Sequence, residues 1–315
     1  MESVEACLPA DLRGPATTIA RIAAGLSGAA VYRVDAGGEA FVLKISGESE
    51  PLASWRRRLH IQQLAANAGL APRVIHADEA RRAIVSAFVV DRSLPAFYGD
   101  SRTGEAALAQ RAQTMRRVHA LPTPPDAEAK DQRELLRAIW SRLAASSALP
   151  DFVGGAVERV LLEEAPARER AWVLSHNDVN PTNLVYDGEH LLLLDWDSAG
   201  PNDPFYDLAA ISVFLRMDDE TCRRLLAAYD GAPLATLPAR FAYNRRLVVI
   251  LCGAAFLMLA RDNGHAGATG GETLDSTPPL GELYQRMRSG VLSLATGEGQ
   301  WWFGLALVKA GVAGP

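Results

Sequence analysis

Cysteine is scarce in this sequence, and the three cysteines lie far apart. Cys7, Cys222 and Cys252 form no Cys-x-x-Cys pair and no Cys/His cluster. Their odd number and wide spacing indicate neither a disulfide framework nor a zinc site. Reduced thiols in a cytoplasmic protein are the simplest interpretation.

A strong charge and a long hydrophobic run are also missing. The formal net charge is only −5, which argues against a nucleic-acid partner because such partners favour a basic surface. The first residues, Met1 to Glu5, lack the basic and apolar regions of a signal peptide. The longest apolar run, 247–260, is shorter than the roughly 20 residues that cross a bilayer. It predicts a buried helix, and we expect no membrane partner.

What the sequence does contain is enough apolar residues for a sizeable core. Its 315 residues are 49% hydrophobic, which suits one large domain or two lobes. The N-terminal part predicts strands around a Gly-containing hairpin, a helix closed by Gly69 and Pro72, and a further strand. These elements are expected at 30–34, 40–45, 54–68 and 83–90.

From about residue 104 the pattern is mainly helical. Helices are expected at 105–119, 131–145, 207–215, 219–229 and 241–262. A strand–hairpin–strand section at 171–195 interrupts them, and loops are expected at 122–130 and 264–281. We therefore predict an α+β fold of two lobes, with a small sheet-rich lobe over 1–90 and a larger helix-rich lobe over 91–315.

The run 176–197 contains the residue types that phosphoryl transfer needs. That reaction uses a carboxylate to orient the attacking hydroxyl and oxygen ligands to hold magnesium. Asp178 and Asn183 are five positions apart, the spacing of a kinase catalytic loop. Two apolar strands around a turn at 187–188 then return Asp195 towards Asn183. Two oxygen ligands for a hard cation are therefore expected to converge.

Three motifs carry a specific family resemblance: His176-Asn177-Asp178-x-x-x-x-Asn183, Leu194-Asp195-Trp196-Asp197-x-Ala199-Gly200 and Asp203-Pro204-Phe205-Tyr206-Asp207-Leu208-Ala209. Together they resemble the choline kinase and aminoglycoside phosphotransferase family. The resemblance implies a protein-kinase-like fold and phosphoryl transfer from ATP or GTP to a hydroxyl of a small molecule. It also implies that Asp178 is the catalytic base and that Asn183 and Asp195 bind Mg²⁺.

The other polar residues of these motifs have structural or alternative roles. His176 is expected to shape the loop, and Asp187 and Gly188 are assigned to the turn. Asp207 could cap the following helix, whereas the resemblance suggests that it braces the catalytic loop. Asp197 could assist at the metal or accept backbone hydrogen bonds.

A Gly-containing turn before the strand at 30–34 is the candidate phosphate loop. Glycine lets backbone amides approach phosphate oxygens closely, although a simple hairpin would also use it. The loop residues are Gly25, Ser27, Gly28 and Ala29. By resemblance alone, adenine is expected against the segment that joins the lobes, at Ser86, Phe88 and Val89.

Lys44 lies on an otherwise apolar strand, where it could pair with nucleotide phosphates or simply face solvent. We favour the phosphate role because of its spacing from the glycine loop and from Asp178. Kinases pair this lysine with a glutamate of the next helix, but the predicted helix 54–68 contains no acidic residue. The candidate substitutes are His60, Gln62, Glu48 and Glu50.

The sequence does not identify the acceptor. A choline-like ammonium would need aromatic walls, for which 301–303, Tyr243 and Tyr284 are candidates unless they belong to the core. An aminoglycoside would favour an acidic pocket, whereas the carboxylates at 218–220 fit a solvated helix start better. Sugars, amino alcohols, homoserine and thiamine-like alcohols stay open.

Two hypotheses follow for the activity. The first is an active small-molecule kinase. The second is a catalytically weakened member of the same fold that binds a ligand or a partner, and the absent helix glutamate motivates it. We favour the first because Asp178, Asn183 and Asp195 are all present.

Overall fold

The structure, a computed structural model, describes residues 4–22, 29–47, 50–92, 104–129, 131–146 and 148–314. Residue contacts divide the chain into two units. Unit 1 comprises Met1–Glu128, Val173–Pro201 and Ala227–Ala232, and unit 2 comprises Ala129–Trp172, Asn202–Leu226 and Pro233–Pro315. The lobe boundary near residue 90 stays a prediction.

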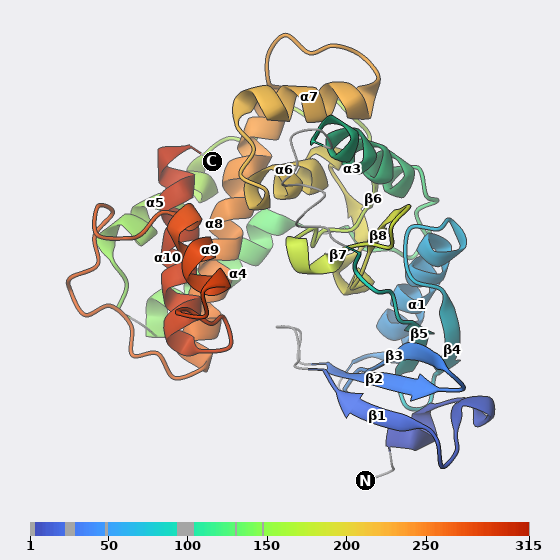
Figure 1. The fold of residues 1–315 in the computed structure, drawn as a ribbon. Helices are drawn as coiled ribbons and strands as arrows, with labels where there is room; N and C mark the ends of the chain where they lie inside the picture. Colours follow the sequence, from blue (N-terminus) through green and yellow to red (C-terminus); the bar gives the residue numbers. More distant parts are fainter. Residues whose placement is uncertain are drawn as a thin grey trace. The chain divides into compact units, whose positions relative to one another are not determined.

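An antiparallel five-stranded sheet forms the N-terminal part of unit 1 (Figure 1). Its strands are β1 (Thr18–Arg21), β2 (Ala30–Ala36), β3 (Glu39–Ile45), β4 (Val74–Asp78) and β5 (Ala83–Ala87), in the order β1-β2-β3-β5-β4. The helical elements of this first part of the chain are the short 3-10 helices η1 (Val4–Cys7) and η2 (Ala10–Leu12), then α1 (Leu52–Asn67) and α3 (Gly104–His119).

The hairpin of β2 and β3 confirms the prediction from its sequence. Gly37 and Gly38 form the turn with φ of 60° and 84°, values that favour glycine because it has no Cβ. Along β3, Phe41 and Leu43 are 4% and 0% exposed and join an apolar cluster on one face of the sheet. Because side chains alternate along a strand, Lys44 lies on the opposite face.

The second part of unit 1 consists of short strands and single turns. Its elements are β6 (Val173–Ser175), η3 (Pro181–Asn183), β7 (Leu184–Tyr186), β8 (Leu191–Leu193), η4 (Trp196–Ser198) and β9 (Gly200–Asn202). β6 pairs with β9. β7 and β8 form an antiparallel hairpin, in which Leu184 lies opposite Leu193.

The predicted turn between β7 and β8 is confirmed. The backbone amides of Glu189 and His190 donate to Asp187 Oδ1 at 2.8 and 2.7 Å, and Gly188 has a φ of 108°. The bond from His190 is the main reason why the pKa of Asp187 lies below its ordinary value, while burial acts in the opposite direction. Asp187 and Gly188 therefore have the structural role that the sequence indicates.

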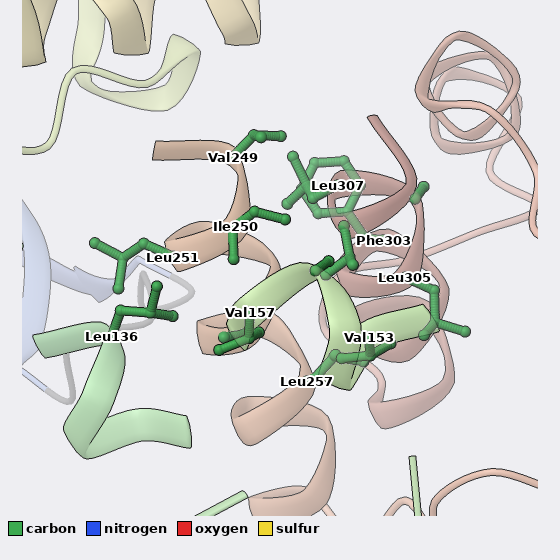
Figure 2. Close-up of a cluster of buried hydrophobic side chains, with 14 of the residues drawn as sticks. Leu136, Val153, Val157, Val249, Ile250, Leu251, Leu257, Phe303, Leu305 and Leu307 are labelled. Carbon is green, nitrogen blue, oxygen red and sulfur yellow. The ribbon is translucent and has the colours of Figure 1, made fainter. Parts of the chain in front are cut away.

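The chain beyond residue 129 is mainly helical, as predicted. Its helices are α4 (Gln132–Ser146), α5 (Asp151–Leu162), α6 (Pro204–Phe214), α7 (Asp219–Asp230), α8 (Ala239–Asp262), α9 (Leu280–Arg288) and α10 (Gly297–Ala313). Figure 2 shows the apolar core of unit 2, in which Leu136 of α4, Val157 of α5, Leu257 of α8 and Phe303 of α10 gather.

Helix α8 is the central element of this core. By length and composition α8 could cross a membrane, but 67% of its apolar window is buried inside the structure. The run 247–260 is thus a buried helix, as expected. Glycines let α10 approach it closely, because a Cβ on Gly304 would lie 2.8 Å from Leu257 Cγ and 3.0 Å from the Gly253 carbonyl oxygen.

Candidate active site

The candidate catalytic loop begins where β6 ends, and His176 fixes its backbone. The imidazole is fully buried. Its Nε2 lies 2.9 Å from the Leu194 carbonyl oxygen, and the Asp178 backbone N–H donates to its Nδ1 at 3.3 Å. The ring also meets Trp196 edge-on, with centroids 4.8 Å apart. These contacts match the loop-shaping role predicted for His176.

Two asparagines hold the carboxylate of Asp178, one at each oxygen. Asn180 Nδ2 donates to Oδ1 at 3.0 Å, and Asn183 Nδ2 donates to Oδ2 at 2.9 Å. Asn180 is itself oriented by the Thr182 backbone N–H, which donates to its Oδ1 at 2.9 Å. Because both oxygens are engaged, the plane of the carboxylate is fixed. Asn180 was not among the site residues predicted from the sequence.

The surroundings of Asp178 change its affinity for a proton. Loss of hydration raises the pKa of Asp178 above its ordinary value, and the negative charge of Asp195 acts in the same direction. The bond from Asn180 and the interaction with His176 oppose this change. The residue as a whole is still exposed, so a ligand hydroxyl can reach a carboxylate whose pKa lies above its ordinary value.

The hairpin of β7 and β8 brings Asp195 back to the catalytic loop, as predicted. The Leu194 backbone N–H donates to the Asn183 carbonyl oxygen at 2.8 Å. Asp195 follows in the left-handed region, with φ of 58°, a conformation that costs energy outside glycine and is common at functional sites. Since the Asn183 side-chain nitrogen faces Asp178, its amide oxygen is the atom available to a cation.

Lys44 is paired with two carboxylates and does not simply face solvent. Its Nζ lies 2.7 Å from Asp195 Oδ1 and 2.6 Å from Asp197 Oδ2, and its side chain is 18% exposed. Asp197 also forms an ion pair with Arg58 of α1, whose Nη1 lies 2.8 Å from Asp197 Oδ1. Burial raises the pKa of Asp197, but the charges of Lys44 and Arg58 outweigh it and leave that pKa below its ordinary value.

None of the described candidates contacts Lys44 in place of a helix glutamate. Gln62 donates to the Ser86 hydroxyl at 3.1 Å, and His60 is exposed. Glu50 instead accepts from Arg58 Nη2 at 2.8 Å. Glu48 lies outside the described residues. The carboxylate partners of Lys44 come from the segment after β8, and the sequence pattern does not indicate this pairing.

The predicted nucleotide-contacting residues fall partly outside the described part of the chain. Gly25, Ser27 and Gly28 are not among the described residues, whereas Ala29 is 8% exposed and directly precedes β2. In the predicted adenine segment, Ser86 accepts from Gln62. The Phe88 backbone N–H donates to the Ala40 carbonyl oxygen at 3.0 Å and continues the β3–β5 ladder.

The cap of α6 is Asp203 and not Asp207. Asp203 Oδ1 accepts from the Phe205 backbone N–H at 2.9 Å, and Arg240 Nε donates to its other oxygen at 2.6 Å. Asp207 lies inside the first turn of α6 and is fully buried. The cap prediction for Asp207 is therefore wrong, because α6 already begins at Pro204, which suits the first helical position, so that the cap is Asp203, four residues before Asp207.

The sequence comparisons agree with this arrangement. The profile of the phosphotransferase enzyme family matches residues 18–243, which is most of the chain. A curated relative, protein LicA of Haemophilus influenzae, is 35% identical over 54 residues. This segment is 17% of the present chain and spans only 20% of that protein.

Solved structures are similar over almost the whole chain. A choline/ethanolamine kinase family protein from Mesorhizobium loti has a TM-score of 0.58 at 20% identity, covering 95% of this chain and 94% of that one. Choline kinase LicA from Streptococcus pneumoniae has a TM-score of 0.60 at 17% identity, covering 88% and 93%. Similar structures also include LicA with AMP, spectinomycin phosphotransferase with ADP and spectinomycin, and a macrolide phosphotransferase.

At these identities the structural likeness establishes the fold, and the profile match establishes the family. Both confirm the resemblance that the sequence motifs indicate. The chain therefore has an α+β, protein-kinase-like fold and belongs to the phosphotransferase enzyme family.

Proposed function

We propose that this protein transfers the γ-phosphate of ATP, or of GTP, to a hydroxyl group of a small molecule. The contact that supports this most directly is the bond from Asn183 to the Asp178 carboxylate, 2.9 Å long. It joins the candidate base to a candidate magnesium ligand inside one unit of the fold. Lys44 and Asp195 lie in the same unit and form an ion pair.

Each of these side chains has a separate task in the proposal. Asp178 orients the acceptor hydroxyl and accepts its proton, because its carboxylate is held at both oxygens on a residue that solvent still reaches. Lys44 contributes positive charge to the nucleotide phosphates. Asn183 and Asp195 supply oxygen atoms to Mg²⁺.

The residues present fit a magnesium ion that is shared with a nucleotide. The donor set is a carboxylate and an amide oxygen, which suits a hard cation. In the described part of the chain, no cluster of three His, Cys, Asp or Glu side chains could hold a metal alone. Mg²⁺ commonly binds one or two protein oxygens together with substrate phosphates. When bound, it would neutralise charge on the transferred phosphoryl group.

The nucleotide is assigned to the lobe over 1–90, and the catalytic loop and acceptor to 91–315. We propose that the loop residues Gly25, Ser27, Gly28 and Ala29 meet the phosphates and that Ser86, Phe88 and Val89 border the adenine. The similar structures with AMP or ADP support a nucleotide site in this fold. Because the Phe88 N–H is already bonded to Ala40, adenine would meet the backbone at Val89.

The acceptor is proposed as a small molecule that carries a hydroxyl, with choline and other amino alcohols tested first. Similar proteins include choline kinases as well as antibiotic phosphotransferases. Tyr243 and Trp301 are 1% and 2% exposed, so they pack in the core of unit 2. The carboxylates of 218–220 start α7, where Asp218 accepts from the Thr221 N–H at 2.8 Å. A cytoplasmic location belongs to the same proposal.

A catalytically weakened binding protein is the alternative proposal. The reason for considering it is that α1 lacks the glutamate that would pair with Lys44. That reason is weaker in the structure, because Asp195 and Asp197 pair with Lys44 instead. Thermal shifts with Mg-ATP separate the two, because a weakened protein that has lost its nucleotide site would give none.

The test is an acceptor panel with coupled detection of ADP. Choline, ethanolamine, aminoglycosides, macrolides, sugars and homoserine are each supplied with Mg-ATP and then with Mg-GTP. We expect nucleoside diphosphate formation that depends on one acceptor class and on Mg²⁺. No acceptor-dependent product, together with no binding of a magnesium nucleotide, would contradict the proposal.

A further inference from the structure

Arg58 of α1 lies at the centre of a chain of alternating charges that ends at Lys44. Its Nη1 is 2.8 Å from Asp197 Oδ1, and its Nη2 is 2.8 Å from Glu50 Oε2 and 2.6 Å from Ser46 Oγ. The other oxygen of Asp197 lies 2.6 Å from Lys44 Nζ. The order of charges is therefore Glu50 (−), Arg58 (+), Asp197 (−) and Lys44 (+).

Burial makes the position of Arg58 specific. The residue is only 8% exposed, and a buried charge is costly unless opposite charges and hydrogen bonds compensate it. Its compensating groups are Ser46 and Glu50 in the connection between β3 and α1, and Asp197 in the segment after β8. A planar guanidinium can reach several acceptors at once in fixed directions, which an ammonium group cannot do.

The two carboxylates that contact Lys44 differ in how they are held. Both oxygens of Asp197 are engaged, one by Arg58 and one by Lys44. Asp195 contacts Lys44 through Oδ1, and the proposed function assigns it to Mg²⁺. If Asp195 turns to the metal, Asp197 is the partner that still holds Lys44, provided that Arg58 keeps Asp197 in place.

We propose that Arg58 is a positioning residue for phosphoryl transfer, which acts by fixing Asp197 so that Asp197 holds Lys44 towards the nucleotide phosphates. The role rests on the proposed function. A helix carboxylate that contacts the lysine directly is thus replaced by a helix arginine that contacts it through a second carboxylate. The sign of the helix charge is reversed, and the orientation of the lysine is retained.

The test uses the full-length protein and Mg-ADP, so that no acceptor has to be known. Calorimetry gives the Kd of Mg-ADP for wild type, Arg58→Met, Arg58→Lys and Asp197→Asn, and thermal melts report folding. We expect Arg58→Met to raise the Kd about tenfold, because a factor of this size corresponds to a moderate coupling energy between two residues of one ion pair. Arg58→Lys should recover part of the loss. The double variant Arg58→Met/Asp197→Asn should bind no worse than Asp197→Asn alone.

The matched control is Arg56→Met on the same helix. Arg56 is exposed and pairs with Glu79, away from Asp197. Since surface ion pairs contribute little, we expect the Kd of Mg-ADP for Arg56→Met to stay within about twofold of the wild-type value. If Arg58→Met does not fold, the comparison is made with Arg58→Gln, which keeps polar contacts without the charge.

Three results would overturn the assignment. A folded Arg58 variant with a lower melting temperature but an unchanged Kd would show that the residue is only structural. Additive effects of Arg58→Met and Asp197→Asn would show that the two residues do not act in series. Failure of the wild-type protein itself to bind Mg-ADP would contradict the proposed function as well, whereas equal binding by wild type and variant contradicts only the role of Arg58.

Discussion

Asn183 donates its side-chain amide to Asp178 twice, at 2.9 Å to the backbone carbonyl oxygen and at 2.9 Å to carboxylate Oδ2. Asp178 and Asn183 are five positions apart in the loop, and these two bonds fix the orientation of both side chains. The amide nitrogen is used by Asp178, and the amide oxygen is left for a cation. The same contact therefore serves both the proton acceptor and the proposed metal ligand.

Replacing Asp195 should remove the effect of magnesium on nucleotide binding. For wild type, Mg-ATP at about 100 times its Kd should stabilise the fold by about 2.7 kcal/mol, which a thermal shift detects. We expect Asp195→Ala to lose most of the additional shift that Mg²⁺ gives over ATP alone. Asp35→Ala is the control, since Asp35 is exposed and pairs with Arg33. Equal magnesium-dependent shifts in wild type and Asp195→Ala would argue against Asp195 as a ligand.

Asn180→Ala should slow turnover without removing the base. The substitution deletes the 3.0 Å bond to Asp178 Oδ1, so the carboxylate loses one of its two fixed contacts. A net hydrogen bond to a charged group contributes about 1.5–3 kcal/mol, which corresponds to a fall in kcat of about ten- to a hundredfold. Steady-state kinetics check this, with the KM for ATP expected to stay the same. A change confined to the KM for ATP would contradict this role.

The turn at Asp187 should give a pH-dependent contribution to stability. Because the pKa of Asp187 is lowered in the folded state, its contribution is fully present above the unfolded pKa of about 3.9 and is lost as the pH falls through the folded pKa. Asp187→Ala should lower the free energy of unfolding by about 0.5–1.5 kcal/mol at pH 7. Urea unfolding at pH 7, 5 and 3.5 should show a similar difference at the first two values and a smaller one at the last. A difference independent of pH would be inconsistent with the bonds to the ionised carboxylate.

The contact of α8 with α10 should tolerate no side chain at Gly304. A Cβ there would lie 2.8 Å from Leu257 Cγ and 3.0 Å from the Gly253 carbonyl oxygen, and backbone cannot easily move. Overpacking costs about 1–3 kcal/mol, and the gain of alanine over glycine in a helix offsets at most roughly 1 kcal/mol of it, so we expect Gly304→Ala to be less stable than wild type. Gly155→Ala is the matched control in α5, because a Cβ there meets nothing within 4 Å. Equal urea midpoints for the two variants would contradict the packing argument.

The sequence predicts the parts of the site that depend on local spacing. Asp178 and Asn183 are fixed by one loop, and the turn at 187–188 alone is enough to return Asp195 to it. The same holds for the hairpin at Gly37-Gly38, where the glycine turn and the alternation of side chains along the strands predict the same structure. Short-range rules therefore locate the catalytic loop and the lysine strand.

The remaining features depend on contacts that are distant in sequence. The ion pair of Arg58 with Asp197 joins α1 to the turn after β8, and no spacing rule indicates it. β1 was not predicted because it is an edge strand without a buried face. α10 was not predicted because glycines such as Gly304 weaken a helical pattern, although the close contact with α8 requires them.

The most direct test of the account is transfer of the γ-phosphate itself. Wild type and Asp178→Asn are incubated with Mg-ATP labelled at the γ-phosphate and with the acceptor selected from the panel, and labelled acceptor is quantified. The account predicts label in the acceptor with wild type, and a rate about 10²–10⁴-fold lower with Asp178→Asn, at unchanged melting temperature. An equal rate in a folded Asp178→Asn, or no labelled acceptor with wild type for any compound, would contradict it.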